Sequence, residues 1–198
     1  MMFTIRSGSM TAVIDSVGAQ LMSLQSVDGT QYLWQGDPKY WPDRSLTIFP
    51  YVARLTDGCY RYRGELYHMP IHGFAPTAEF SVAEQTDAAI TFVLESCPAF
   101  YEQYPFLFRY SIRYRLENAT LHVEITVENK DEKTMYFGLG GHPGINVPLE
   151  EGLRFEDYVI EVPPCQPRRM EFTPACFITG RELPFPMECN QLPLSHHM

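Results

Sequence analysis

Strict alternation of apolar and polar residues is the feature that most constrains the fold of this chain. Residues 121–128 read Leu-His-Val-Glu-Ile-Thr-Val-Glu, and Arg113–Glu117 alternates in the same way. Side chains of a β-strand point to opposite faces in turn, so a period of two predicts strands that bury one face each. Asn118-Ala119 between the two runs predicts a tight hairpin turn.

The same period recurs along most of the chain. It predicts a pair of strands at Glu79–Ala83 and Ala89–Leu94, and a meander formed by residues 11–15, 19–24 and Tyr32–Trp34. A short helical turn is expected within 98–105, and beyond Pro163 frequent prolines leave only short strands. Many short strands with turn signals between them predict an all-β fold, a large antiparallel β-sandwich. No repeat or linker divides the sequence, so we predict a single domain over residues 1–198.

Charge and composition exclude several classes of partner. The formal net charge of −9 argues against nucleic acid and against an anionic membrane surface, because phosphate repulsion would not be offset. No apolar run approaches the length of a bilayer span, and the first residues lack the apolar core of a signal peptide. Five cysteines, an odd number without CxxC spacing, favour reduced thiols. We therefore predict a cytoplasmic protein with no membrane association.

A histidine in a glycine-rich stretch is the first candidate for chemistry. His142 follows Gly140-Gly141 and precedes Pro143, and this stretch comes after the two strongly alternating strands. Glycine leaves the imidazole uncrowded, and proline biases the residue before it toward extended geometry. Imidazole exchanges protons readily near neutral pH, so His142 is a candidate proton donor or acceptor.

Two further residues are weaker candidates. Arg54 follows an apolar run and precedes the Asp57-Gly58 turn, where its guanidinium could bind ligand oxygens; a surface arginine paired with a carboxylate is the alternative. His72 lies beside Gly73 and near a proline; a loop histidine bonded to the backbone is the alternative. No spacing matches a zinc, calcium or phosphate-loop motif, so we predict neither a metal nor a cofactor.

Taken together, the chain resembles the aldose 1-epimerase (galactose mutarotase-like) family, and within it the branch of bacterial LacX-type proteins. The resemblance extends over nearly the whole chain. Its markers are Tyr32–Pro38 with Trp41, Phe49-Pro50 with Arg54, His72-Gly73-Phe74, Tyr104-Pro105-Phe106, and Gly140-Gly141-His142-Pro143 with Pro148.

The resemblance implies a β-sandwich of the supersandwich type and an isomerase that interconverts the α- and β-anomers of a hexose. In that reaction a base removes the proton of the C1 hydroxyl while an acid protonates the ring oxygen. The resemblance implies that His142 is this acid, and that His72 and Arg54 bind sugar hydroxyls. It implies no metal or organic cofactor, and a free or phosphorylated hexose as the ligand.

The sequence departs from the family in one respect. The family's general base is a glutamate in the last third of a longer chain, and a sugar-binding aspartate precedes it. This sequence ends before either position, so the resemblance predicts that the C-terminal strands are missing. A truncated form, a shifted reading frame and a natural short form are all open. We expect an impaired isomerase that still binds sugar, and unpaired strand edges that favour a homodimer.

Two other functions stay open. The chain could be a non-catalytic carbohydrate-binding β-sandwich in which Trp34, Trp41 or Tyr104 stacks on sugar rings. It could also be a fragment without activity of its own. A carboxylate across the pocket from His142 would favour the enzyme, whereas a binding protein needs none.

Overall fold

The computed structural model describes residues 1–187 and 189–196, and it contains two compact units, Met1–Asn146 and Val147–Met198. Antiparallel strand pairs make up both units. The α-helix in the described residues is the single turn α1, Pro98–Tyr101, where a helical turn was expected. The all-β prediction is confirmed, and the single domain over 1–198 stays a prediction.

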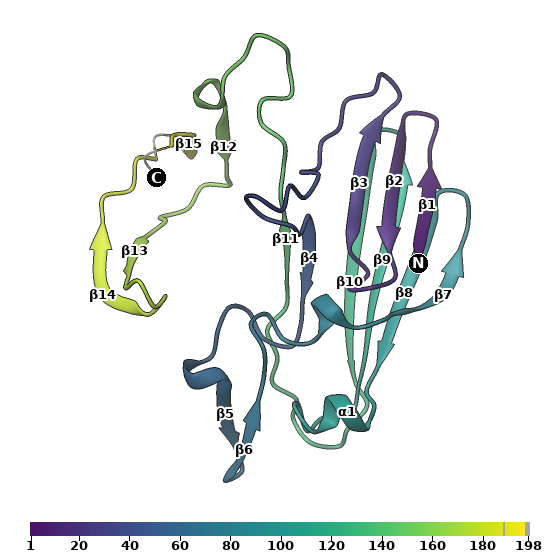
Figure 1. The fold of residues 1–198 in the computed structure, drawn as a ribbon, viewed down its shortest axis with the longest axis vertical. Helices are drawn as coiled ribbons and strands as arrows, with labels where there is room; N and C mark the ends of the chain where they lie inside the picture. Colours follow the sequence, from purple (N-terminus) through teal and green to yellow (C-terminus); the bar gives the residue numbers. More distant parts are fainter. Residues whose placement is uncertain (188, 197–198) are drawn as a thin grey trace. The chain divides into compact units, whose positions relative to one another are not determined.

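A four-stranded antiparallel sheet contains the strands that alternate most clearly. It is ordered β10-β9-β8-β7, with β7 at Ser81–Gln85, β8 at Ala89–Glu95, β9 at Phe108–Glu117 and β10 at Thr120–Asn129 (Figure 1). Thr120 pairs with Glu117 across the Asn118-Ala119 turn, so the predicted hairpin is confirmed. Every second residue of β9 from Phe108 to Leu116 is buried, as the period of two requires.

The N-terminal sheet differs from the predicted meander in one strand. It is ordered β1-β2-β3, with β1 at Met2–Arg6, β2 at Met10–Asp15 and β3 at Leu21–Ser26. Only the start of Tyr32–Trp34 pairs with β3, where the N–H of Tyr32 donates to the carbonyl of Leu24 at 2.9 Å. Beyond it, the N–H of Trp34 donates to the carbonyl of Gly144, and Leu33 bridges Ile145. A pairing partner so distant along the chain leaves no local signal in the sequence, and this accounts for the error.

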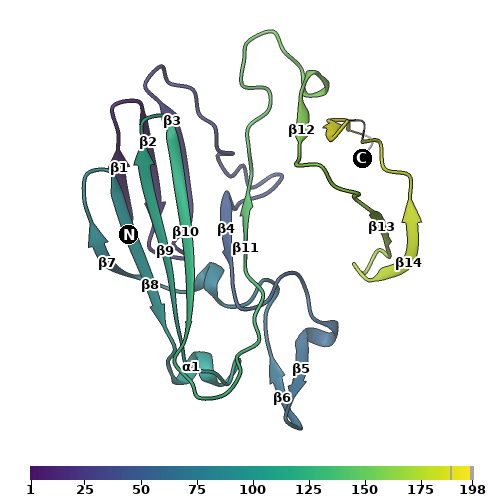
Figure 2. The same cartoon turned by 180° about the vertical axis from the view of Figure 1, so that it is seen from behind.

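Two sheets stack to enclose the core of the first unit. Figures 1 and 2 show β1–β3 on one side and β7–β10 on the other. Phe49 lies at the centre of the buried aromatic residues and stacks on Tyr110 with ring centroids 4.5 Å apart. The rings of Phe74 and Phe108 contact Phe49 edge-on. Burial of these rings accounts for much of the stability that the hydrophobic effect gives this unit.

Two short strand pairs complete the first unit. β4 (Ser45–Ile48) pairs with β11 (Gly140–Pro143), and His142 lies opposite Leu46 in that register. β5 (Cys59–Tyr62) and β6 (Glu65–His68) form a hairpin, with the 3-10 turns η1 (Thr56–Gly58) and η2 (Ala75–Thr77) before and after it. The glycine-rich stretch is therefore held in a strand pair rather than in a free loop.

The second unit contains short strands only, as its prolines predict. β12 (Val159–Glu161) pairs with β15 (Gln191–Pro193), β13 (Arg169–Phe172) pairs with β14 (Ile178–Leu183), and η3 spans Phe155–Asp157. None of the described residues in this unit is buried. No helix in the described part of the chain is long and apolar enough to cross a membrane.

Two buried tyrosines of β9 provide a matched test of the core. The Tyr114 hydroxyl donates to the carbonyl of Ala19 at 2.8 Å, whereas the buried Tyr110 hydroxyl has no hydrogen-bond partner among the described residues. Tyr114→Phe should lower the free energy of unfolding by about 1–2 kcal/mol because it strands a buried carbonyl. Tyr110→Phe should be neutral or stabilising. Urea unfolding measures both, and equal losses in the two variants would contradict this assignment.

Candidate functional site

The structure brings the two candidate histidines together. His142 lies in β11, and His72 lies in the turn that follows β6. Their ring centroids are 5.9 Å apart, with the rings inclined at 61°. Two imidazoles at this separation can contact one small ligand together, because each ring nitrogen is a donor or an acceptor according to its protonation state.

A backbone contact fixes the orientation of the His72 ring. The N–H of Ala53 donates to His72 Nδ1 at 3.2 Å, and the N–H of His72 donates to the Ala53 carbonyl at 3.0 Å. Since Nδ1 accepts a hydrogen bond, the proton of the neutral ring lies on Nε2. Both residues have left-handed backbone angles, with φ of 71° at Ala53 and 65° at His72, which is uncommon for residues other than glycine.

The environment of His72 favours its neutral form. Partial burial is the larger cause that lowers the pKa of His72, and repulsion by His142 is the second. A neutral imidazole with its proton on Nε2 is a hydrogen-bond donor at neutral pH. Such a group can bind a sugar oxygen without bringing a charge into the site.

The lowered pKa of His72 predicts how stability depends on pH. Because the folded protein binds this proton less well than the unfolded chain, the resulting stability is present above the usual value of 6.5. It is lost as the pH falls through the folded-state pKa. On acidification the melting temperature of the wild-type chain should fall further than that of His72→Asn, since asparagine tolerates the left-handed backbone. An equal fall in melting temperature for the wild-type chain and His72→Asn on acidification would contradict the assignment.

His142 is exposed and rests against a tryptophan. Its ring centroid lies 5.0 Å from that of Trp41, at an interplanar angle of 51°. The glycine at position 144 is explained by steric limits. A methyl group at Gly144 would lie 2.8 Å from Trp34 Cβ and 3.0 Å from the ring of Trp41. Gly144 thus allows both tryptophans to approach this segment. The pattern of glycines alone indicated only an uncrowded imidazole.

Arg54 is connected to the histidine pair through its neighbour in the sequence, Ala53. It directly follows Ala53, the residue that holds His72, and its side chain is exposed. Within the described residues it forms no ion pair within 4.0 Å, so the structure gives no carboxylate partner of the kind that a structural arginine would have. Its role in binding a ligand stays a prediction.

One proposed stacking platform is wrong, and one neighbour was missed. Tyr104 is 3% exposed, and its hydroxyl donates to the carbonyl of Tyr136 at 2.7 Å, so little of its ring is left for a sugar to stack on. The backbone of Ala53 could not be identified from the sequence, because an N–H group has no residue-specific signal. No group of three or more metal-ligating side chains occurs in the described part of the chain.

An aromatic cavity of about 550 Å³ lies along the same loop. Neither histidine lines it. Its walls are mostly apolar, and they are formed by Pro50, Tyr51, Val52, Leu55, Tyr60, Arg61, Tyr62, Met69, Tyr104, Phe106, Tyr136, Phe137 and Gly138.

Comparison with known sequences agrees with these features. A family profile described as aldose 1-epimerase matches residues 1–180. Protein LacX (plasmid) of Lactococcus lactis subsp. lactis is 31% identical over 169 residues, which cover 81% of this chain and 56% of that protein. The uncharacterized protein YihR of Escherichia coli (strain K12) is 27% identical over 172 residues, 81% of this chain and 54% of that protein. The chain thus spans about half the length of these curated relatives.

Solved structures of relatives have the same fold. A galactose mutarotase-like protein from Lactobacillus casei ATCC 334 matches with a TM-score of 0.90 and 33% identity, over 100% of this chain and 68% of that one. A galactose mutarotase related enzyme from Lactobacillus acidophilus matches with a TM-score of 0.89 and 33% identity, over 98% of this chain and 65% of that one. The fold is therefore galactose mutarotase-like, and the predicted sandwich is confirmed.

Proposed function

This chain belongs to the aldose 1-epimerase family, and we propose that it binds an aldose at the His72–His142 pair and promotes opening of the sugar ring. The observation that supports this most directly is the approach of the two imidazoles, one oriented by Ala53 and the other exposed against Trp41. The ligand class is a hexose, free or phosphorylated.

The chemistry needs one proton removed and one supplied. A base takes the proton from the C1 hydroxyl, the bond between C1 and the ring oxygen breaks, and the ring oxygen receives a proton. The carbonyl carbon then turns over, and the ring closes on its other face. His142 supplies the proton to the ring oxygen, while neutral His72 and Arg54 donate hydrogen bonds to sugar hydroxyls.

We propose further that the reaction is slow, with no carboxylate of this chain acting as the general base. Within the described residues, neither His72 nor His142 forms a hydrogen bond or ion pair with a carboxylate. A positioned base contributes about 10²–10⁴-fold to the rate of such a proton transfer, so the chain should retain sugar binding with little acceleration.

Exchange of anomers measures both parts of this proposal. Two-dimensional NMR exchange of α- and β-galactose or glucose with added protein gives the rate, and line broadening of the sugar signals reports binding. The expected result is broadening, with an exchange rate modestly above the spontaneous one. No broadening for any hexose or hexose phosphate would contradict the binding proposal. A rate near those typical of enzymes, about 10 s⁻¹ or faster, would contradict the expected impairment.

A sugar-binding protein without catalysis is the second candidate, and Trp41 favours it. An indole packed against the exposed His142 can stack on the apolar face of a sugar ring.

Trp41→Ala should weaken sugar affinity about tenfold, because aromatic stacking contributes about 0.5–1.5 kcal/mol beyond its buried area. Tyr101→Ala is the control, since Tyr101 is an exposed aromatic side chain of α1 whose ring contacts Lys133. Equilibrium dialysis with labelled galactose measures the affinities. Equal affinities for wild type and Trp41→Ala would exclude Trp41 from the site.

A further inference from the structure

β10 forms one end of the four-stranded sheet. Its inner edge pairs with β9 over all ten residues, from Thr120 opposite Glu117 to Asn129 opposite Phe108. Its outer edge has no strand partner among the described residues. The free backbone N–H and C=O groups of such an edge can bind another strand.

The two ends of this sheet differ in how they are protected. β7, at the opposite end, has five residues and a register irregularity between Val82 and Glu84. Short length and bulges of this kind hinder pairing with another chain. β10 is twice as long, its register is continuous, and it contains no proline, lysine or glycine. Val123 at its middle is 48% exposed. Of the two ends of this sheet, β10 is therefore the one that offers a complete template for a further strand.

We propose that β10 pairs antiparallel with β10 of a second copy of this chain, with Val123 opposite the partner's Val123. A two-fold axis then sets each His122 opposite the partner's Glu124, and each Leu121 opposite the partner's Ile125. An imidazole N–H faces a carboxylate twice, on the outer face of the sheet. Aliphatic side chains meet on the inner face, where opposite-residue contacts stabilise paired strands.

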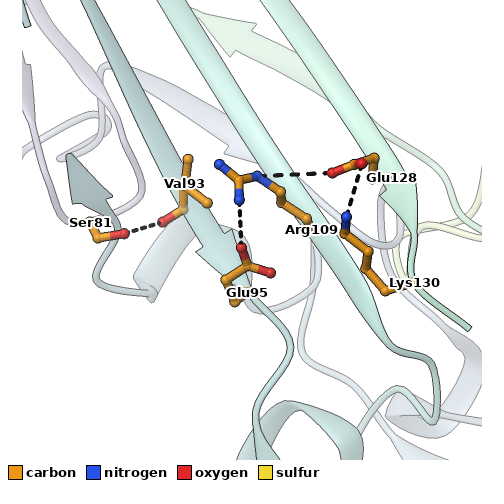
Figure 3. Close-up of polar contacts among 6 residues, drawn as sticks. All are labelled: Ser81, Val93, Glu95, Arg109, Glu128 and Lys130. Atoms are coloured by element: carbon orange, nitrogen blue, oxygen red, sulfur yellow. Dashed lines mark hydrogen bonds and ion pairs between the residues drawn. The ribbon is translucent and has the colours of Figure 1, made fainter. Parts of the chain in front are cut away.

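Other strand registers close to this one would bring less favourable side chains opposite each other. A shift by one residue in the partner would place apolar side chains opposite polar ones. Centring the pair on Glu124 would place two carboxylates opposite each other. Centring it on Ile125 would place His122 opposite the partner's Glu128, but Glu128 already binds Lys130 at 3.0 Å and Arg109 at 3.9 Å (Figure 3).

Glu124 and His122 remain available for the partner. Glu124 forms no ion pair within 4.0 Å among the described residues. His122 Nε2 lies 3.5 Å from Glu117 Oε2, and no hydrogen bond joins these two side chains among the described residues, so the N–H of the neutral ring can donate across the interface. On the apolar face of β10, Leu121, Val123 and Ile125 line a groove of about 570 Å³ that residues of β3, β4 and β11 also line. The inference is independent of the proposed sugar chemistry.

Analytical ultracentrifugation of the wild-type chain tests the pairing directly. We expect a concentration-dependent dimer at about 10–100 µM, the range of modest interfaces. Glu124→Lys and His122→Glu should each raise the dimer dissociation constant about tenfold or more, because symmetry changes two facing pairs at once. The double variant His122→Glu with Glu124→Lys should regain affinity, since the introduced lysine faces the introduced carboxylate.

Controls separate the register from a general loss of charge or fold. Glu128→Gln should leave the dimer intact; dissociation by Glu128→Gln with none by Glu124→Lys would overturn the register. Far-UV circular dichroism shows whether each variant keeps its sheet. Val123→Cys should give an oxidised dimer on denaturing gels well above that of the wild-type chain, which has five free cysteines in the structure. A dissociation constant of about 100 µM is typical of a modest interface. A wild-type chain that stays monomeric at about 100 µM would therefore overturn the proposal.

Discussion

His142→Ala is expected to remove the acceleration of anomer exchange by this chain, whatever its size in the wild type. Loss of a positioned general acid lowers a proton-transfer rate about 10²–10⁴-fold, so a modest acceleration should fall to the spontaneous rate. The exchange rate of α- and β-galactose measured by NMR gives the result. Sugar binding should persist, because Trp41 and His72 remain in place.

A second histidine provides the control for this variant. His68 is exposed in β6 and pairs with Cys59 across the hairpin. His68→Ala should leave exchange unchanged, which separates the role of His142 from a general effect of histidine as a buffer. Exchange that survives in His142→Ala but disappears in His72→Ala would reassign the acid. Loss in both His142→Ala and His68→Ala would point to a non-specific effect.

Local patterns predicted the parts of the fold that depend on local contacts. The β9–β10 hairpin is an example, because its two strands are adjacent in the chain and each alternates with a period of two. The pairing of β4 with β11 could not be predicted, since nothing in Ser45–Ile48 indicates a partner so far along the sequence. The same reason explains the part of Tyr32–Trp34 that was not predicted, namely its pairing with residues 144–146; its contact with Leu24 of β3 is the local part.

The candidate site likewise has features that local sequence patterns predicted and features that depend on contacts between distant residues. Neighbouring glycines and prolines singled out His72 and His142 one at a time, and only the resemblance to a family suggested that they act together. Their approach depends on β11 pairing with β4 and on the backbone contact between His72 and Ala53, both of which are non-local. Aromatic content suggested Trp41 and Tyr104 equally as stacking platforms. Burial distinguishes them, and burial is a property of the folded core.

The sharpest constraint on the site is a glycine rather than a histidine. Gly73 follows His72, has φ of 77° and is buried. A methyl group at this position would lie 2.2 Å from the carbonyl oxygen of Phe49, well inside any real contact. Phe49 is fully buried at the centre of the aromatic core, so its backbone cannot move without disturbing that packing. The turn that presents His72 therefore depends on the absence of a side chain at this position.

Gly73→Ala should lower the free energy of unfolding by about 3 kcal/mol or more, which combines the left-handed backbone penalty with the clash. For a chain of this size that is a fall in melting temperature of about 6–12 °C. Gly64→Ala is the matched control, because Gly64 has φ of 90° but open space around its Cβ position. It should lose only about 1 kcal/mol, the backbone part alone. Thermal and urea unfolding of the two variants separate these contributions. Equal losses would show that the contact with Phe49 adds nothing, and that the turn holding His72 can shift at little cost.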